Sequence, residues 1–250
     1  MASRFTWLPA LLACAGGASW ADPICPDRPG KGTGTCIVPA GVVQVETGLV
    51  DWTDAGADDV TVIGSSLIKY GLSDRADVEI GVTPLITSHG ESGFGDMLLR
   101  VKYRLTAEGS AVQVAIDPFV KLPTANSHFG NRRVEGGVVV PVSAPLGKSP
   151  LSLSLAPEVD WIADADGEGY HAAMSQVAGL GVAATPRFAF GAELWGHWDW
   201  DPAGTVSQAS ADGWLTYLAS DDVQLDGGAN FGLNAATPDV ELYAGVAVRF

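Results

Sequence analysis

Residues 96–105 read DMLLRVKYRL, so apolar and charged side chains alternate along them. Successive side chains of a β-strand point to opposite faces, and this alternation therefore predicts a strand with one apolar and one ionic face. The apolar face carries Met97, Leu99, Val101, Tyr103 and Leu105, and the other face carries Asp96, Leu98, Arg100, Lys102 and Arg104. Ten residues at ~3.3 Å each and a ~40° tilt span about 25 Å, the height of the apolar band of an outer-membrane barrel.

The same period of two recurs along the rest of the chain, from residue 41 to the end. Two segments depart from it, because Trp52 falls on the polar face of its segment and 171–184 mixes the two faces, and each is predicted to contain a β-bulge. The twelve predicted strands are 41–52, 60–72, 76–87, 96–105, 111–121, 133–142, 151–161, 171–184, 188–200, 210–219, 223–234 and 240–250.

The connections between these strands alternate in length. Short turns are predicted at 73–75, 106–110, 143–148, 185–187 and 220–222, and longer links at 53–59, 88–95, 122–132, 162–170 and 201–209, with a shorter last link at 235–239. This pattern and the even strand number predict an all-β fold, a transmembrane antiparallel up-and-down barrel of about 12 strands. A secreted β-sandwich or small soluble barrel is the rival, since it also alternates. Aromatic residues at the ends of the apolar faces favour the membrane, where such residues form interfacial girdles: Trp161, Trp198 and Trp200 at one end, Phe188 and Phe250 at the other.

Composition excludes other classes of protein. The chain has 250 residues, of which 47% are hydrophobic and 17% charged, and 14 Lys and Arg against 29 Asp and Glu give a net charge of −15. An acidic chain does not neutralise phosphates, so a nucleic-acid partner is excluded. Beyond the first residues there is no apolar run of ~18 residues, so no transmembrane helix is expected.

The first 21 residues read as a secretory signal peptide, with Arg4 ahead of an apolar stretch at 5–18 and a cleavage site at Ser19-Trp20-Ala21. Cys14 is interpreted as part of this leader rather than as a lipidation site. The predicted organisation is therefore a signal peptide at 1–21, an N-terminal segment at 22–40 and an outer-membrane barrel at 41–250. The location that follows is the bacterial outer membrane, with lipid and lipopolysaccharide as partners.

The segment 22–40 is rich in proline and glycine and holds both cysteines of the exported chain, Cys25 and Cys36. An exported chain meets an oxidising compartment, so a disulfide between them is predicted. Neither has a histidine or a third cysteine nearby, and no metal site is expected. The bridged segment is expected to be periplasmic, and its insertion into the lumen as a plug is left open.

If the apolar face meets lipid, the other face lines an aqueous lumen. Thirteen acids against seven bases then make the lumen negative, which favours cations. The alternative is that opposite charges pair between strands and fill the lumen, and Asp77, Glu79 and Asp117 are the partners expected for the basic strand 96–105. Strand parity assigns Glu46, Asp77, Glu79, Asp96, Asp117, Glu135, Glu158, Asp160, Glu193, Asp199, Asp212, Asp226, Glu241, Lys69, Arg100, Lys102, Arg104, Lys121, Arg133 and Arg249 to this face, with His197.

Signals for chemistry are weak. Asp164, Asp166 and Glu168 have a carboxylate spacing that suits Ca²⁺, but they lack a full calcium loop and are interpreted as a solvated loop. The acidic loops are also candidates to bridge lipopolysaccharide phosphates through divalent cations. An acid–base cluster of His197 with Glu193 and Asp199 is the one enzymatic hypothesis, a barrel-wall lipid-modifying enzyme. We therefore expect that the protein is not an enzyme and that it has no cofactor.

Several short motifs resemble an outer-membrane transporter family named after the meta-pathway of phenol degradation. The matching stretches include Pro39-Ala40-Gly41, Lys69-Tyr70-Gly71-Leu72-Ser73-Asp74-Arg75, Lys121-Leu122-Pro123-Thr124, Leu225-Asp226-Gly227-Gly228 and Val248-Arg249-Phe250. The resemblance implies a transporter-like β-barrel and carries no catalytic set with it.

The expected function is passive passage of a small solute, and the family name suggests an aromatic or other hydrophobic compound. A non-conducting structural or surface-interaction barrel with a lumen plugged by side chains is the alternative. The terminal Phe250 closes an alternating apolar row, which is the sorting signature that the barrel-assembly machinery reads, so this machinery is an expected partner.

Overall fold

The computed structural model describes residues 24–54, 56 and 59–250, and the leader predicted at 1–21 lies outside them. Sixteen strand segments make up one sheet. Their bounds are β1 Val43–Asp54, β2 Val60–Ile63, β3 Ser65–Ser73, β4 Ala76–Val82, β5 Leu85–Ser88, β6 Glu91–Gly93, β7 Met97–Arg104, β8 Gln113–Leu122, β9 Glu135–Val139, β10 Val142–Pro145, β11 Leu151–Ala163, β12 Tyr170–Ala183, β13 Phe188–Asp199, β14 Val206–Ser220, β15 Val223–Gly232 and β16 Val240–Arg249.

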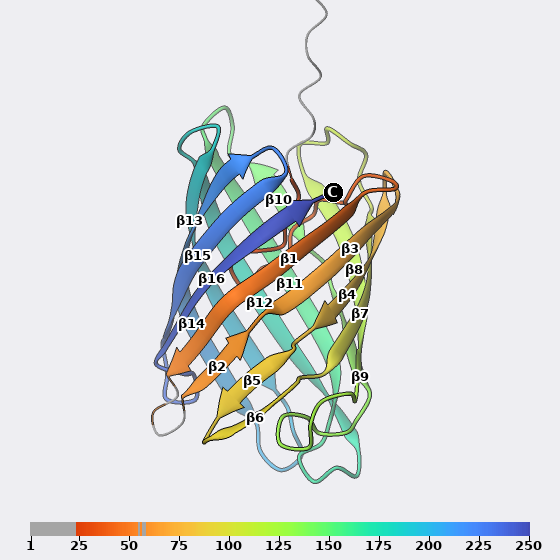
Figure 1. Cartoon of the computed structure of the whole chain (residues 1–250), viewed down its shortest axis with the longest axis vertical. Coiled ribbons are helices and arrows are strands. Elements are labelled where there is room, and N and C mark those ends of the chain that lie inside the picture. Colours follow the sequence, from red (N-terminus) through yellow and green to blue (C-terminus); the bar gives the residue numbers. More distant parts are fainter. Residues whose placement is uncertain (1–23, 55, 57–58) are drawn as a thin grey trace, which may run out of the picture.

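The sheet is a closed antiparallel barrel (Figure 1). The long strands pair in the order β16-β15-β14-β13-β12-β11-β10-β8-β7-β4-β3-β1, and β16 pairs back onto β1 from Gln44↔Arg249 to Asp54↔Val240. The β1–β16 pairing closes the sheet and covers the two edges that an open sheet would expose, which is the condition for a sheet to lie in lipid. Within the described residues no helix has the length and apolar character needed to cross a bilayer.

The barrel has twelve spans, because four of them are interrupted and each contributes two segments: β2 with β3, β4 with β5, β6 with β7, and β9 with β10. Gly64, with a positive φ of 73°, separates β2 from β3. Pro84 and Pro141 lie at two other breaks, where the missing N–H of proline interrupts the hydrogen-bond ladder. The predicted barrel of about 12 strands is confirmed.

The two predicted bulges have different outcomes. In β1 the register against β16 shifts between Gly48 and Val50, which places the outlying Trp52 beyond a bulge. In β12 the register is continuous against both neighbours, so the bulge predicted there is wrong. Its inner face is instead made of small residues such as Ala173, Ser175 and Gly179, and their low hydrophobicity hid the alternation.

One predicted long link is also wrong. Residues 88–95 contain β6, and β5 turns into it through His89 and Gly90, whose φ angles are 53° and 78°. Two successive positive φ angles define a tight hairpin turn of the primed type. The sequence carried only a weak sign of it, since histidine rarely takes this conformation.

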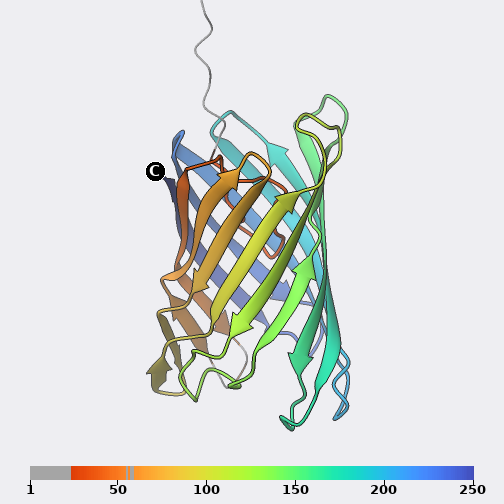
Figure 2. The same cartoon turned by 90° about the vertical axis from the view of Figure 1, so that its right-hand side faces the viewer.

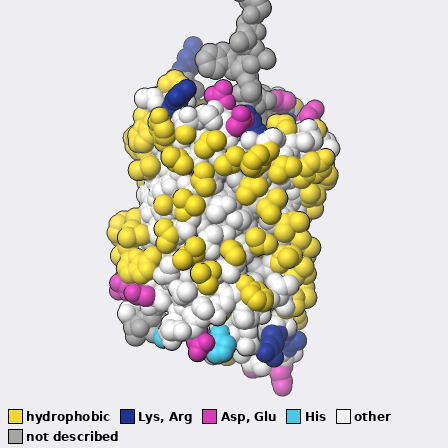
Figure 3. All heavy atoms as spheres, in the orientation of Figure 1, with side chains coloured by type: hydrophobic (Ala, Val, Ile, Leu, Met, Phe, Trp, Pro, Cys, Tyr) yellow, Lys and Arg dark blue, Asp and Glu magenta, His cyan; other side chains and the backbone are white. Residues whose placement is uncertain are grey.

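The two faces of the wall have opposite chemistry. The outer face exposes many apolar side chains, and the space-filling view shows groups of them along the visible wall, with charged side chains gathered at the two ends (Figure 3). The inner face buries ionic side chains such as Glu46, Lys69 and Lys102. A soluble sandwich has the reverse arrangement. The expected aromatic positions Trp161, Trp198, Trp200, Phe188 and Phe250 are all exposed.

Residues 24–40 lie inside the barrel near the end that carries the C-terminus and the short turns (Figure 2). Ile24, Cys25, Ile37 and Val38 are buried there, and Ala40 forms a β-bridge with Gly71 before the chain enters β1. The position of the segment is therefore the lumen, the place that the sequence left open.

Candidate pore and the N-terminal segment inside it

The N-terminal segment is a loop that enters the lumen and returns. A disulfide between Cys25 and Cys36 joins its two arms. Gln44 of β1 holds the first arm, since its side chain accepts from Cys25 N at 3.2 Å and donates to Cys25 O at 2.8 Å. The second arm is held by Asp77 of β4, which accepts from Val38 N at 2.8 Å. Backbone groups that have no strand partner thus find partners on the wall.

Asp27 lies at the centre of an ionic cluster, defined here as the Asp27 cluster and formed with Glu46, Lys69, Glu79 and Lys102. Its carboxylate accepts from Lys69 Nζ at 2.7 Å and from Lys102 Nζ at 2.6 Å. Lys69 also contacts Glu46 at 2.6 Å, and Lys102 lies 3.3 Å from Glu79. Both lysines are almost fully buried, so the cluster compensates charges that would otherwise be very unfavourable.

The charge state of Asp27 follows from this cluster. Burial alone would raise its pKa, but the charges of Lys102, Lys69 and Arg100 outweigh burial and hold the pKa of Asp27 well below its usual range. Asp27 is therefore an anion at every physiological pH, and the segment is tied to the wall by a permanent charge.

The structure places the partners expected for the basic strand next to it, but not all of them form ion pairs. Asp77 lies opposite Lys102 and Glu79 opposite Arg100 in the register of β4 with β7, and Asp77 accepts from Val38 N instead of forming an ion pair with Lys102. Arg100 donates to Asp117 of β8 and lies 3.4 Å from Glu79. On this side of the barrel, the inner face is an ion-pair ladder.

The tip of the loop reaches the opposite wall. Arg28 donates to Asp226 of β15 at 3.1 Å, and its guanidinium lies 5.8 Å from the ring centre of Tyr243. Lys31 N donates to Glu193 of β13 at 3.0 Å. Gly30 permits this close approach, because its φ is 91° and an added Cβ would lie 2.6 Å from Glu193 Oε2.

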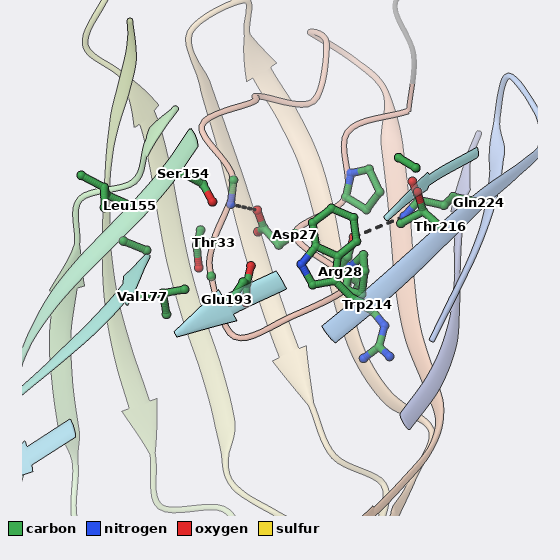
Figure 4. A pocket seen from close by; sticks show the side chains of 16 residues that line it. Asp27, Arg28, Thr33, Ser154, Leu155, Val177, Glu193, Trp214, Thr216 and Gln224 are labelled. Carbon is green, nitrogen blue, oxygen red and sulfur yellow. Dashed lines mark hydrogen bonds between the residues drawn. The ribbon is translucent and has the colours of Figure 1, made fainter. Parts of the chain in front are cut away.

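The loop does not fill the cross-section of the lumen. A cavity of about 280 Å³ lies between the loop and β11–β15, and Figure 4 shows Asp27 and Arg28 of the loop among the residues that line it, together with Glu193 and Trp214 of the wall. A second cavity of about 260 Å³ lies on the other side, between the loop and β1–β7. Glu158 lines a third cavity of about 280 Å³ with Lys31.

The remaining residues predicted to line the lumen lie nearer its ends. At the end of the barrel with the long links, Lys121 bridges Asp96 and Glu135 at 2.9 Å each, and Arg133 lies 6.0 Å from the ring centre of Tyr170. At the other end, Arg104 donates to Asp74 O and Arg249 to Asp222. Asp160 and Asp212 are buried on the inner face. The role of all these residues in conduction stays a prediction.

The structure does not assemble the acid–base cluster hypothesised around His197. The Nδ1 atom of His197 forms a hydrogen bond with Ser175 Oγ at 2.9 Å, and its ring stacks on Trp195. Glu193 instead accepts a hydrogen bond from the backbone N–H of Lys31 in the loop, and Asp199 is hydrogen-bonded to His171.

His171, which the sequence analysis did not single out, joins two neighbouring segments at the end of the barrel with the long links. Its Nδ1 lies 2.7 Å from Asp164 and its Nε2 lies 2.7 Å from Asp199. Ligand atoms of Asp164, His171 and Asp201 lie within 4.8 Å of one another, a spacing that a metal ion would accept. Hydrogen bonds from Ala203 N and Ala165 N lower the pKa of Asp201. The sequence placed Asp164 with Asp166 and Glu168 instead, because only the fold brings 164, 171 and 201 together.

Fold and lumen together define a β-barrel of the bacterial outer membrane, with a polar interior and an apolar outer wall. The chain belongs to the family described as "Putative MetA-pathway of phenol degradation", whose model matches residues 26–250. The match covers the barrel and nearly all of the described N-terminal segment. A comparison with curated proteins gives no match.

Solved structures share the fold. The COG4313 outer-membrane channel from Pseudomonas putida F1 is similar with a TM-score of 0.68 and 15% identity, over 89% of this chain and 99% of that one. A CymD monoaromatic hydrocarbon channel is similar with a TM-score of 0.48 and 9% identity, over 85% of this chain and 88% of that one. The translocator domain of the autotransporter NalP from Neisseria meningitidis has a TM-score of 0.45 at 10% identity, over 84% of this chain and 87% of that one. At these identities the likeness is one of fold.

Proposed function

We propose that this protein is a passive channel of the outer membrane for a small solute. The observation that carries the proposal is the set of cavities on both sides of the N-terminal loop, which leave space inside the lumen. A barrel that served only as a structural element would gain stability by filling this space with side chains. Membership of the phenol-degradation family supports an aromatic or other hydrophobic solute.

The mixed lining of the first cavity supports the same class of solute. Val177 and Trp214 supply apolar surface, while Glu193, Ser154 and Gln224 supply polar groups. Such a lining accepts an apolar body and orients it by a few hydrogen bonds.

The test is the ionic current through the purified full-length protein in a planar lipid bilayer. We expect discrete conductance steps from the wild type and a slowing of the current by added aromatic solute. Larger steps are expected when Asp27→Asn weakens the attachment of the loop. Absence of current from both proteins would contradict the proposal and would favour a non-conducting barrel.

The non-conducting alternative is favoured by one specific observation. The Asp27 cluster ties the loop to three strands, β3, β4 and β7, by close contacts with Lys69 and Lys102 and through Glu79. In that case the loop is a permanent plug, and current is expected only from variants that release it.

A further inference from the structure

A fourth cavity, of about 210 Å³, lies between the tip of the loop and the inner face of β13–β16. We define it as the Lys31 cavity. Lys31 of the loop lines it, and the side chains that the wall contributes include Trp195, Ser210, Asn230 and Glu241, from β13, β14, β15 and β16. In the strand register Trp195 lies opposite Ser210 and Asn230 opposite Glu241, so the four side chains are neighbours on one face.

The Lys31 ammonium occupies a position that the wall forms from an anion and an aromatic face. Its Nζ donates to Glu241 Oε2 at 3.0 Å and lies 5.0 Å from the ring centre of Trp195. A carboxylate beside an indole face is a favourable environment for an alkylammonium ion, since the ring quadrupole adds to the charge attraction. The loop therefore presents to the wall the same group that a protonated amine would present.

A second observation points to a ligand. Asn230 is almost fully buried, and its Nδ2 donates to Glu241 Oε2 at 2.7 Å, which fixes the orientation of the amide. Its Oδ1 then has no hydrogen-bond partner among the described residues. A buried acceptor without a donor is unfavourable, and an N–H group in the cavity would satisfy it.

The wall around the Lys31 cavity is negatively charged, like Glu241 itself. From residue 170 to 248 the sequence contains no lysine and one arginine, Arg187, which lies exposed in a turn. The inner face of β13–β16 nevertheless buries Glu193, Asp212 and Asp226. Arg28 and Lys31 of the loop pair with Asp226 and Glu241 of this inner face, so a cation that replaced Lys31 would meet a negative field.

From these contacts we infer that the Lys31 cavity is a subsite for a protonated primary amine with an aromatic or apolar body, and that Lys31 is its tethered occupant. The inference deepens the proposed function, because it names a solute class for the same lumen. The ligand ammonium takes the place of Lys31 Nζ against Glu241 and Trp195, and it donates to Asn230 Oδ1.

The test is calorimetric titration of the detergent-solubilised full-length protein with benzylammonium chloride. Lys31→Met removes the tethered ammonium but keeps the backbone hydrogen bond to Glu193. We expect this variant to bind benzylammonium at least tenfold more tightly than the wild type. Adding Glu241→Gln to it should abolish the gain. Lys148→Met, in an exposed turn near the opposite end of the barrel, is the matched control and should behave as the wild type.

Neutral benzyl alcohol and anionic benzoate separate charge recognition from a merely larger cavity. Neither should bind more tightly to Lys31→Met than to the wild type. An equal gain for benzyl alcohol, or no gain for benzylammonium, would overturn the inference. Lys31→Arg keeps the charge and should retain wild-type binding, and Lys31→Ala repeats the test if Lys31→Met does not fold.

Calorimetry needs no current, so it distinguishes the two proposals. A protein that gains benzylammonium binding but passes no ions supports the subsite and contradicts the channel. One that conducts but shows no gain in Lys31→Met supports the channel and contradicts the subsite.

Discussion

Asp27 holds the N-terminal loop in the lumen because its one carboxylate accepts hydrogen bonds from lysines on two different strands. Removing one partner of a buried ion pair leaves the other charge uncompensated, at a cost of about 3 kcal/mol. Asp27→Asn keeps the shape of the side chain and removes its charge. We expect it to raise the fraction of time that the loop is released on the order of a hundredfold. The measurement is the open fraction in single-channel records, and Asp74→Asn, in an exposed turn, should leave that fraction unchanged.

The pH dependence of this attachment follows from the low pKa of Asp27. A carboxyl group whose pKa is depressed in the folded protein contributes its full stabilisation above the unfolded value of about 4, and this contribution is lost as the pH falls through the lower folded value. We therefore expect the open fraction to stay the same between pH 7 and pH 4.5. A loop that is released in this interval would contradict the charge assignment.

At the scale of the strand, the facing of side chains can be tested in β13. Leu194 lies at the middle of this strand and is 60% exposed on the outer face. Arginine at the bilayer midplane of a barrel costs ~2–4 kcal/mol, so we expect Leu194→Arg to lower the free energy of unfolding by about that amount. Denaturant titration in lipid vesicles measures it.

Ser154→Arg is the control on the inner face. Ser154 lines a cavity, and the Cβ position of Gly179 lies within 3.0 Å of both Ser154 Oγ and Glu193 Cγ, so an arginine here has space and an acid nearby. Its cost should be much smaller. Equal costs for the two variants would contradict the assignment of outer and inner faces.

The disulfide acts on the loop as an element. It closes a loop with a sequence separation of 11, and a cross-link of this size stabilises by roughly 3 kcal/mol through the entropy of the released chain. Replacement of Cys25 and Cys36 by serine should therefore make the loop more accessible to added protease and increase its open fraction. A reducing agent should have the same effect on the wild type and none on the double variant. If reduction leaves both readouts unchanged, the ionic contacts alone hold the loop.

Alternation predicted the strands well, because the lipid-facing and lumen-facing side chains of a barrel differ so strongly in polarity. It failed where that difference vanishes, as in β12, and where a turn depends on the backbone conformation of one residue, as at His89. The ion pairs of Arg100 and Lys102 were predictable, since partners on adjacent strands follow from register.

The contacts of the loop were not predictable in the same way. Asp27, Arg28 and Lys31 stand in a segment without periodicity, and their partners lie up to 210 positions away in the sequence. Only closure of the barrel brings Asp226 and Glu241 to them. For the same reason His171 was missed, since its partners Asp164 and Asp199 lie in different segments of the chain.

For the molecule as a whole, charge is divided between two walls. β3–β8 carry acids and bases in pairs, whereas on β13–β16 the acids Asp226 and Glu241 pair with Arg28 and Lys31 of the loop. We expect the open channel to favour cations, and a reversal potential in a KCl gradient that favours K⁺ measures this preference.

Asp212→Asn tests which wall is responsible. Asp212 is buried on the acidic wall and makes no salt bridge in the described part of the chain, so its removal should weaken the K⁺ preference while the barrel stays folded. Asp221→Asn, in an exposed turn, should have no effect. An anion-favouring wild type would contradict the prediction.

The position of the loop also constrains how the molecule is assembled. Residues 24–40 precede β1 directly, and they touch β1 at Gln44 and β15 at Asp226, on either side of the junction where the last strand joins the first. Once β16 has paired with β1, the loop can reach the lumen only through the two open ends of the barrel. Either the bridged loop is in place before β16 pairs with β1, so that the barrel closes around it, or it enters through one end of the barrel afterwards. In the first case oxidation of the cysteines precedes insertion, and biogenesis and gating share one element.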